Sequence, residues 1–362
     1  MKILVVYATA GAGHKKAAQA IYEGLKARGH EGAVYLDVLK YTDRLYRKSY
    51  SKTYTFLITR TPWLWGFFFW LTGLRPLFGL LQIVRRWHNS LHAAAFHRYL
   101  VKEQFDYIFS THFLSNEVAA YLKRTGRIKS RLICSVTDFD VHPIWLSQGV
   151  DTYTVASEWT KKRIIALGVP DNRVAVTGIP VLEKFSSHQD IGPLKEKLRL
   201  QDFVFTVLVA TGSFGIGPIE QIIEALAGFQ VIVVCGHNRS LYTRLRRKEK
   251  KLVMVHGLVD NMDELMAVSD AMITKPGGLS ISEALIAGLP LIFFHAIPGQ
   301  ESHNIRALKE HGVGISGCRI REMKTVLENF RDSPETYRSA RENIKGLARP
   351  RAVEDIIALM AR

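Results

Sequence analysis

The chain has 362 residues, of which 47% are hydrophobic and 23% charged, and this indicates two domains with large cores rather than one. Its formal net charge of +16 favours nucleic acid, anionic lipid or a phosphorylated substrate as a partner, without selecting among them. Three widely spaced cysteines, Cys134, Cys235 and Cys318, exclude a disulfide framework and a cysteine metal site, so we expect reduced thiols in a cytoplasmic protein without a signal peptide.

Apolar runs alternate with helical patterns along most of the chain. The runs are almost wholly apolar, which is typical of parallel strands buried on both faces. The first half has them at 3–8, 33–37, 105–110, 131–137, 151–156 and 173–177, with helical patterns at 14–28, 115–124 and 158–168. The second half has them at 203–210, 229–235, 252–256, 270–273 and 290–294. This order predicts an α/β protein with two doubly wound domains.

Composition also predicts where the domains end. The polar stretch 183–200 contains Ser186-Ser187 and Gly192-Pro193, so we expect a linker there, between domains at 1–182 and 201–347. The remaining residues, 348–362, include the stretch PRAVEDIIALM, which is typical of a short amphipathic helix.

A glycine-rich turn separates the first predicted strand from the first helix. It contains Gly11, Gly13 and His14, but Lys16 stands where the dinucleotide fingerprint needs a third glycine, and the phosphate-loop pattern is absent. Asp37, near the end of the second strand, keeps a dinucleotide site open. His14 would lie near the positive end of the helix, where its pKa falls and the ring stays neutral, as a general base requires. The alternative is a histidine that helps to cap the helix.

Residues 44–100 carry no strand signal. Basic residues come first, followed by PWLWGFFFWLTGLRPLFGLLQIV and then Arg85-Arg86. The apolar run has the length of a membrane span, but Arg75-Pro76 and several glycines interrupt it. Tryptophan between basic flanks favours the headgroup level of an anionic membrane, so we expect insertion into the membrane surface. The residues expected there are Trp63, Trp65, Phe68 and Trp70. The alternative is a buried helical pair within the N-terminal domain.

Three loops of the second half follow predicted strands and open helices. Gly212, Ser213 and Gly215 would let backbone N–H groups approach an anion. A second loop offers the charge of Lys275, the glycines Gly277 and Gly278, and then Glu283, whose carboxylate could accept both hydroxyls of a ribose. A third offers Gln300, Glu301 and Asn304, groups suited to sugar hydroxyls. Three such loops at the carboxyl ends of one sheet predict a diphosphate ligand.

These segments resemble the monogalactosyldiacylglycerol synthase and processive diacylglycerol glucosyltransferase family, and more distantly the peptidoglycan glycosyltransferase that acts on lipid I. The resemblance rests on ATAGAGH (8–14), TDFDVHPIW (137–145), TGIPV (177–181), TGSFG (211–215), TKPGGLSISEAL (274–285) and PGQESHN (298–304). It implies the GT-B fold, in which two Rossmann-like domains face a cleft, and a last helix that crosses back to the N-terminal domain. The alternative for that helix is a cover for the C-terminal sheet alone.

The resemblance also assigns roles to residues. It implies an inverting transfer in which His14 is the base for the acceptor hydroxyl, while Asp138 orients His14 or is itself the base. The acceptor side would use Gly11, Gly13, His142 and Trp145. The donor side would use Gly212, Ser213, Gly215, His237, Gly257, Leu258, Lys275, Pro276, Gly277, Gly278, Glu283, Gln300, Glu301 and Asn304. The triplet Asp138-Phe139-Asp140 matches the acceptor-side motif, so we expect no metal site there.

The resemblance implies a UDP-hexose donor, a diacylglycerol or glycolipid acceptor and no required cofactor, at the cytoplasmic face of the cell membrane. Glucose against galactose, the number of sugars added and the oligomeric state stay open. A UDP-sugar epimerase of the same fold is one alternative, although a soluble substrate needs no membrane anchor; another lipid-linked acceptor is a second. A nucleic-acid-binding protein is a third, but the sequence has no zinc spacing or recognition-helix pattern, and we expect no nucleic acid partner.

Overall fold

A computed structural model describes residues 1–9, 11–74, 92–248, 251–294 and 296–361. The chain folds into two compact units. The first unit comprises Met1–Glu183, Ile297–Asn304 and Arg349–Arg362; the second comprises Lys184–Ala296 and Ile305–Ala348. A short segment from late in the sequence, Ile297–Asn304, therefore belongs to the first unit.

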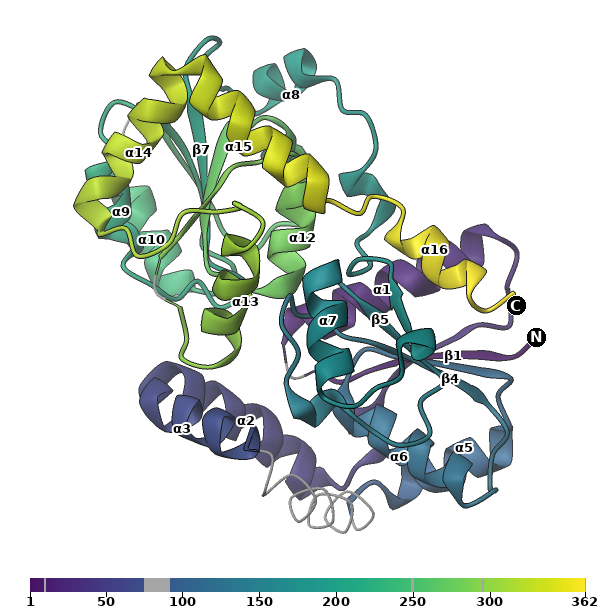
Figure 1. The fold of residues 1–362 in the computed structure, drawn as a ribbon. Helices are drawn as coiled ribbons and strands as arrows, with labels where there is room; N and C mark the ends of the chain where they lie inside the picture. The colour runs from purple at the N-terminus through teal and green to yellow at the C-terminus, as the bar shows by residue number, and fades with distance from the viewer. Residues whose placement is uncertain (10, 75–91, 249–250, 295, 362) are drawn as a thin grey trace. The chain divides into compact units, whose positions relative to one another are not determined.

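The first unit is built on a parallel sheet with the strand order β2-β1-β3-β4-β5-β6 (Figure 1). Its strands are β1 (Ile3–Tyr7), β2 (Val34–Asp37), β3 (Tyr107–Ser110), β4 (Arg131–Ser135), β5 (Thr152–Val155) and β6 (Val174–Val176). Its helices are α1 (Ala12–Ala27), α2 (Arg44–Arg60), α3 (Pro62–Thr72), α5 (Ala94–Glu103), α6 (Phe113–Arg124), α7 (Glu158–Ala166) and α16 (Ala352–Ala358), with 3-10 turns at Val38–Tyr41, Pro143–Trp145 and Asp171–Arg173.

The position of β1 within the sheet explains why its sequence is an uninterrupted apolar run. Ile3 and Val5 pack in the cluster that contains residues of α1 and α16, whereas Leu4 and Val6 pack in the cluster beneath α5 and α6. Because helices cover both faces of the sheet, successive side chains are buried in turn. Helix α16 contributes Ile356 to the first of these clusters and so packs on the first unit, beside α1 in Figure 1.

The second unit has a parallel sheet of its own, in the order β11-β10-β7-β8-β9. Its strands are β7 (Thr206–Ala210), β8 (Gln230–Val234), β9 (Val253–His256), β10 (Ala271–Thr274) and β11 (Leu291–Phe293). Its helices are α8 (Ile191–Lys197), α9 (Ile219–Ala225), α10 (Arg239–Arg247), α11 (Met262–Ala267), α12 (Gly278–Ile286), α14 (Ile320–Asp332) and α15 (Pro334–Leu347). Helix α13 (Gln300–Lys309) begins in the first unit and ends in the second, and Glu183–Phe185 forms a 3-10 turn.

Both sheets have a topological switch point. In the first, the chain passes from β1 to β2 on one side and then to β3 on the other, and in the second it leaves β7 for β8 and later returns to β10. Loops that leave the carboxyl ends of strands on either side of a switch point diverge and leave room for a ligand. The predicted doubly wound fold class is confirmed, because each predicted strand run overlaps a strand of the corresponding parallel sheet.

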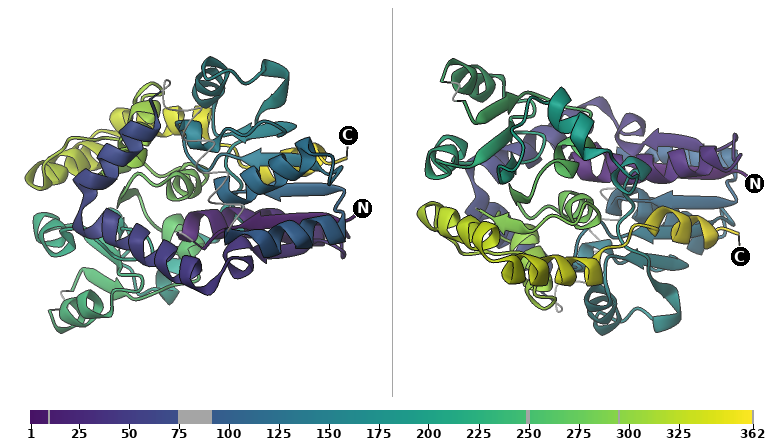
Figure 2. Two further views of the ribbon diagram at one scale, coloured as in Figure 1. Left: turned by 90° about the horizontal axis from the view of Figure 1, so that it is seen from below. Right: turned by 90° about the horizontal axis from the view of Figure 1, so that it is seen from above.

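The region after β2 is helical where it is described. None of the α3 residues Pro62–Thr72, all of which are described, is buried, so the expected alternative of a buried helix is wrong for α3. Trp63 is 69% exposed, Trp70 58% and Phe68 45%, while Trp65 is half-buried. Helix α2 packs on the first-unit core through Tyr46 and Tyr50, and α3 follows it in the chain (both dark blue in Figure 2). Among the described residues, no helix is both long and apolar enough to cross a membrane. Arg75-Pro76 and Arg85-Arg86 lie outside the described residues.

Candidate active site

Three polar side chains meet at the switch point of the first sheet. His14 lies in the first turn of α1, His112 follows β3, and Thr137 follows β4. His14 Nδ1 lies 3.1 Å from Thr137 Oγ1, and the hydroxyl of Thr111 donates to the backbone carbonyl of His14 at 3.0 Å. The ring of His14 therefore contacts a neighbouring strand end, and the helix-capping alternative has no support in its contacts.

Aromatic rings complete the surroundings of His14. The ring of His112 meets it edge-on with centroids 5.0 Å apart, and Trp145 lies 5.9 Å away. His112 is almost fully buried; its Nδ1 accepts a hydrogen bond from the backbone N–H of Leu114, so the proton of the neutral ring is on Nε2, 3.4 Å from the Tyr50 hydroxyl. Burial lowers the pKa of His14 to about 4, opposed by a hydrogen bond to the Thr111 backbone. His14 is thus neutral at physiological pH.

Asp138 is buried next to Thr137 and is held by the segment Ile297–Asn304. Gln300 Nε2 donates to Asp138 Oδ1 at 2.7 Å, and Asn304 Nδ2 donates to the same oxygen at 3.2 Å. Burial raises the pKa of Asp138 to about 6 even though both amides stabilise the carboxylate. Among the described residues Asp138 makes no hydrogen bond to His14, so the interaction that orients the ring comes from Thr137.

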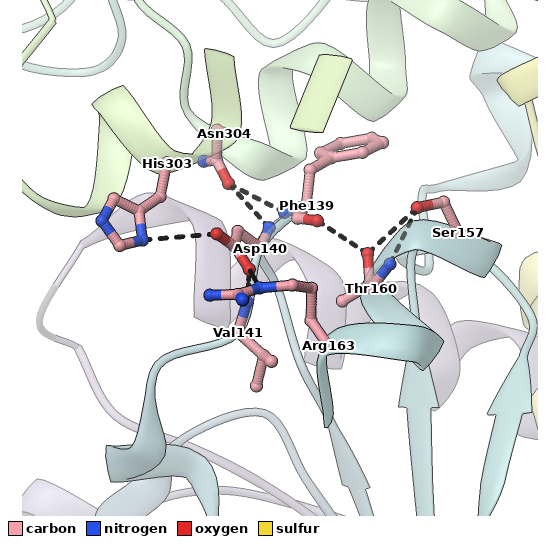
Figure 3. Close-up of polar contacts among 8 residues, drawn as sticks. All are labelled: Phe139, Asp140, Val141, Ser157, Thr160, Arg163, His303 and Asn304. Carbon is pink, nitrogen blue, oxygen red and sulfur yellow. Dashed lines mark hydrogen bonds and ion pairs between the residues drawn. The ribbon is translucent and has the colours of Figure 1, made fainter. Parts of the chain in front are cut away.

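The same segment is fixed to the rest of the first unit by a second set of contacts (Figure 3). Asn304 is fully buried, and its Oδ1 accepts from the backbone N–H groups of Phe139 at 2.8 Å and Asp140 at 3.4 Å. His303 Nδ1 lies 3.3 Å from Asp140 Oδ2, and Arg163 Nε lies 3.1 Å from Asp140 Oδ1. Burial works against the charge of Asp140, but His303 and Arg163 together lower its pKa to about 2.

Helix α3 contacts the segment TDFDVHPIW (137–145) through His142. Its Nδ1 accepts from the Ile144 backbone N–H at 3.1 Å, which leaves the proton on Nε2, and this nitrogen donates to the carbonyl of Phe69 at 2.9 Å. His142 is 7% exposed and Trp145 is 3% exposed. Both side chains therefore pack against neighbouring groups: His142 contacts α3, and Trp145 lies beside the ring of His14.

The second unit presents backbone rather than side chains at its switch point. Gly212, Gly215 and Gly217, in the loop after β7, and Gly236, after β8, all have positive φ. A Cβ on Gly215 would lie 2.2 Å from the Cys235 carbonyl oxygen, and one on Gly236 would lie 2.4 Å from the Ser213 carbonyl oxygen. These residues must be glycine because two loops pass each other in backbone contact.

Hydrogen bonds join these loops further. The His237 N–H donates to the Ser213 carbonyl at 2.8 Å, and the Gly236 N–H donates to the Gly257 carbonyl at 3.2 Å, so the loops after β7, β8 and β9 are connected. Across the switch point, the Thr274 hydroxyl at the end of β10 donates to the Ala210 carbonyl at the end of β7, at 2.7 Å. The predicted loops at 211–215 and 275–278 therefore leave neighbouring strands at one edge of the sheet.

Helix α12 begins at that edge. Its N-cap residue Gly277 provides no side-chain cap, and nothing lies within 4 Å of the position of an added Cβ on Gly277 or Gly212. Uncapped N–H groups at a helix start attract an anion, and the helix dipole adds to that attraction. Lys275 is half-buried beside this start and Pro276 is buried. In the described residues no group of three His, Cys, Asp or Glu side chains is arranged to hold a metal ion.

Two family matches cover most of the chain. Residues 14–181 match the monogalactosyldiacylglycerol synthase family, and residues 206–332 match the C-terminal domain of glycosyltransferase family 28. The expected resemblance to the monogalactosyldiacylglycerol synthase family is thus confirmed for residues 14–181, and a second glycosyltransferase model matches the later part of the chain. It is 32% identical over 237 residues to an enzyme of Bacillus subtilis named processive diacylglycerol beta-glucosyltransferase, covering 64% of this chain and 62% of that one. The enzyme of the same name from Bacillus pumilus is 29% identical over 96% of this chain and 91% of its own.

Solved structures share the fold at low identity. MurG of Acinetobacter baumannii matches with a TM-score of 0.62 and 12% identity, covering 100% of this chain and 99% of MurG. A UDP-GlcNAc 2-epimerase of Neisseria meningitidis, bound to UDP-GlcNAc, matches with a TM-score of 0.60 and 13% identity over the full length of both chains. The predicted GT-B fold is confirmed by these matches, and the fold alone does not separate transferases from epimerases.

Several expected site residues lie where they could contact a ligand. His237 is exposed, Leu258 is 62% exposed, and Gln300 and Glu301 are half-buried, with Glu301 Oε2 accepting from the Ile297 N–H at 2.7 Å. Glu283, one turn into α12, is by contrast buried, with only 4% of its surface exposed. Asn304 was expected to contact the donor sugar, but its buried amide is hydrogen-bonded to Asp138 and to the backbone of Phe139 and Asp140. We therefore assign it to positioning Asp138.

The sequence interpretation missed Thr137, His112 and Phe69. The first two each lie two residues beyond the end of a strand, β3 or β4, so their place at the carboxyl ends of strands was a usable signal. For Phe69 the sequence holds no signal, because it lies between aromatic residues that point elsewhere.

Proposed function

We propose that this chain is an inverting glycosyltransferase that moves a hexose from a UDP-sugar to diacylglycerol or a glycolipid at a membrane surface. The observation that carries the proposal is His14, a histidine kept neutral by burial at the switch point of the first unit, in a chain whose relatives bear the name processive diacylglycerol beta-glucosyltransferase. A neutral imidazole is what a general base for an acceptor hydroxyl requires.

The chemistry is a single displacement. The acceptor hydroxyl gives its proton to His14 while its oxygen bonds to the anomeric carbon of the hexose. The bond from that carbon to the diphosphate breaks, and UDP leaves with the electron pair. Attack from the side opposite the leaving group inverts the anomeric centre. The uncapped start of α12 and the charge of Lys275 would stabilise the diphosphate as its negative charge grows.

For the donor we propose contacts from both glycine-marked loops of the second unit and from the segment Ile297–Asn304. The loops after β7 and β10 would hold the diphosphate by backbone N–H groups, and Glu283 would meet the ribose. Gln300 uses its amide nitrogen on Asp138, which leaves its carbonyl oxygen for a sugar hydroxyl. Glu301 would be the second sugar contact.

For the membrane we propose peripheral attachment through α3 at the cytoplasmic face. Trp63, Phe68 and Trp70 are exposed on this helix, and exposed Arg44, Arg47, Lys48 and Arg60 precede it on α2. Aromatic burial and attraction to anionic lipid would each contribute, with about 1 kcal/mol for each basic residue near the surface.

The membrane proposal has a direct test. Replacing Trp63, Trp65 and Trp70 by serine should release the protein from anionic vesicles even at low salt, while circular dichroism stays that of the folded wild type. High salt alone should release only part of the wild type, because it screens charge and leaves apolar burial intact. A folded wild type that stays in the supernatant with anionic vesicles would remove membrane binding from the proposal. Competing DNA should not displace the vesicles.

The activity itself is tested with radiolabelled UDP-glucose and UDP-galactose, each incubated with diacylglycerol vesicles and followed by lipid extraction. The proposal predicts label in the lipid phase for one of the two donors, in the anomeric configuration opposite to that of the donor, and a rate of labelling lower by roughly two to four orders of magnitude with His14→Ala. Conversion of a UDP-sugar to its epimer without any lipid product would instead favour the epimerase alternative.

A further inference from the structure

Helix α3 has an inner face that differs from its exposed aromatic side. Gly66, Phe69 and Gly73 recur at helical spacing along that face. A Cβ on Gly66 would lie 2.6 Å from Pro298 Cβ, and a Cβ on Gly299 would lie 2.8 Å from Phe69 Cγ. Gly299 also has a φ of +96°, which a larger residue rarely adopts. The helix and the segment Ile297–Asn304 are therefore in a contact that two glycines make possible.

Phe69 is the centre of this contact. Its ring lies 4.2 Å from the ring of His142 and meets His303 edge-on at 5.4 Å, between centroids. The hydrogen bond from His142 Nε2 to the Phe69 carbonyl holds the backbone of α3 in place at the same residue. Aromatic pairs of this geometry add to the free energy of simple apolar burial.

The segment that Phe69 touches also carries Gln300. Gln300 bonds Asp138 at 2.7 Å, and its neighbours His303 and Asn304 bond the stretch Phe139–Asp140. The segment thus lies between two supports, the acceptor motif on one side and the inner face of α3 on the other. A shift of α3 would remove one support without breaking any hydrogen bond of Gln300.

We propose that Phe69, together with His142, is a positioning residue that holds the segment Ile297–Asn304 so that Gln300 and Glu301 present their polar groups to the donor sugar. This inference rests on the proposed function for the donor contacts. It gives α3 two separate roles: the exposed tryptophans bind lipid, and the inner face sets the affinity for the sugar part of the donor.

The test compares Phe69→Ala with Phe67→Ala, the same truncation two residues earlier on the same helix, at a residue that is 49% exposed. The acceptor is a short-chain diacylglycerol used below its aggregation concentration, so that no lipid surface is needed. Phe69→Ala should raise KM for the UDP-hexose about three- to tenfold, the size expected for a lost aromatic contact, with KM for the acceptor and the dissociation constant for UDP unchanged. Its sedimentation with anionic vesicles should equal that of the wild type. Phe67→Ala should keep the wild-type KM for the donor.

Phe69→Leu provides a second variant, because leucine refills most of the space with apolar atoms. If Phe69 positions the segment, this variant should have a KM for the UDP-hexose between those of the wild type and Phe69→Ala. It also serves as the test if the alanine variant does not fold. Equal donor KM in wild type, Phe69→Ala and Phe69→Leu would overturn the inference, as would a parallel loss of UDP affinity. Absence of transfer by the wild type, both to the short-chain diacylglycerol and to diacylglycerol in vesicles, would instead count against the proposed function.

Discussion

The glycine-rich turn between β1 and α1 and the one between β7 and α9 share a strand–turn–helix pattern and differ in what they present. Gly11 has an extended φ of −172°, and nothing lies within 4 Å of the position of an added Cβ. In the second unit, Gly215 and Gly236 have positive φ and touch neighbouring backbone. The first turn serves to place a side chain, His14, whereas the second unit offers an edge of backbone N–H groups. Two glycine-rich sequences of similar pattern are therefore suited to different chemistry, base catalysis in the first unit and anion binding in the second.

The largest expected effect comes from the side chain of the first turn. His14→Ala should lower turnover by roughly two to four orders of magnitude, because a general base is lost, while UDP affinity stays unchanged. Lys15→Ala, at the next residue of α1, is the matched control and should retain wild-type turnover. Steady-state kinetics with calorimetry of UDP binding checks both. Near-normal turnover of His14→Ala would move the base to Asp138.

The second effect is a difference in the free energy of unfolding between alanine variants of the two turns. Gly215→Ala forces a side chain into the left-handed region and against the Cys235 carbonyl, so it should lower the free energy of unfolding by about 1–3 kcal/mol. Gly11→Ala meets neither obstacle and should stay within about 0.5 kcal/mol of the wild type. Urea unfolding of both variants measures the difference. Equal losses would mean that the two turns do not differ in the way described.

The third effect separates nucleotide from sugar. Glu283→Ala should weaken UDP and UDP-hexose together, because the ribose is common to both. Gln300→Ala and Glu301→Ala should spare UDP and weaken UDP-hexose about three- to tenfold, the size of one or two hydrogen bonds. Isothermal calorimetry with the two ligands distinguishes these patterns. Equal losses of UDP affinity in all three variants contradict the assigned roles.

The smallest effect is a pH dependence. Burial raises the pKa of Asp138 to about 6 and lowers that of His14 to about 4. As pH falls through about 6, Asp138 gains a proton and weakens its hold on Gln300 and Asn304, whereas His14 stays neutral until about 4. The acid limb of kcat/KM should therefore lie near pH 6 in the wild type and move toward 4 in Asp138→Asn. An unchanged limb in that variant would assign the titration to another group.

Much of this arrangement could be predicted from the sequence. Wholly apolar strand runs and the glycines that follow them predicted both sheets and the loops at their carboxyl edges, because burial on two faces leaves a simple pattern. His14 could be singled out for the same reason, since it lies in the turn that follows the first strand.

The roles of buried polar groups could not be predicted in this way. Asn304 belongs to a motif that suits sugar hydroxyls, yet its amide is buried against Phe139 and Asp140, and only the three-dimensional contacts reveal this. Trp63, Trp70 and Phe69 are equally apolar in sequence, but helical rotation exposes the first two and turns the third toward His142.

The central claim is that backbone of the second unit, and not the first glycine turn, holds the nucleotide. Hydrogen exchange of backbone amides, measured with and without UDP, tests it most directly because it reports on the N–H groups themselves. The account predicts slowed exchange in peptides covering 211–217 and 277–281, with peptides covering 7–16 unchanged. Slowed exchange at 7–16, with none at 277–281, would contradict it.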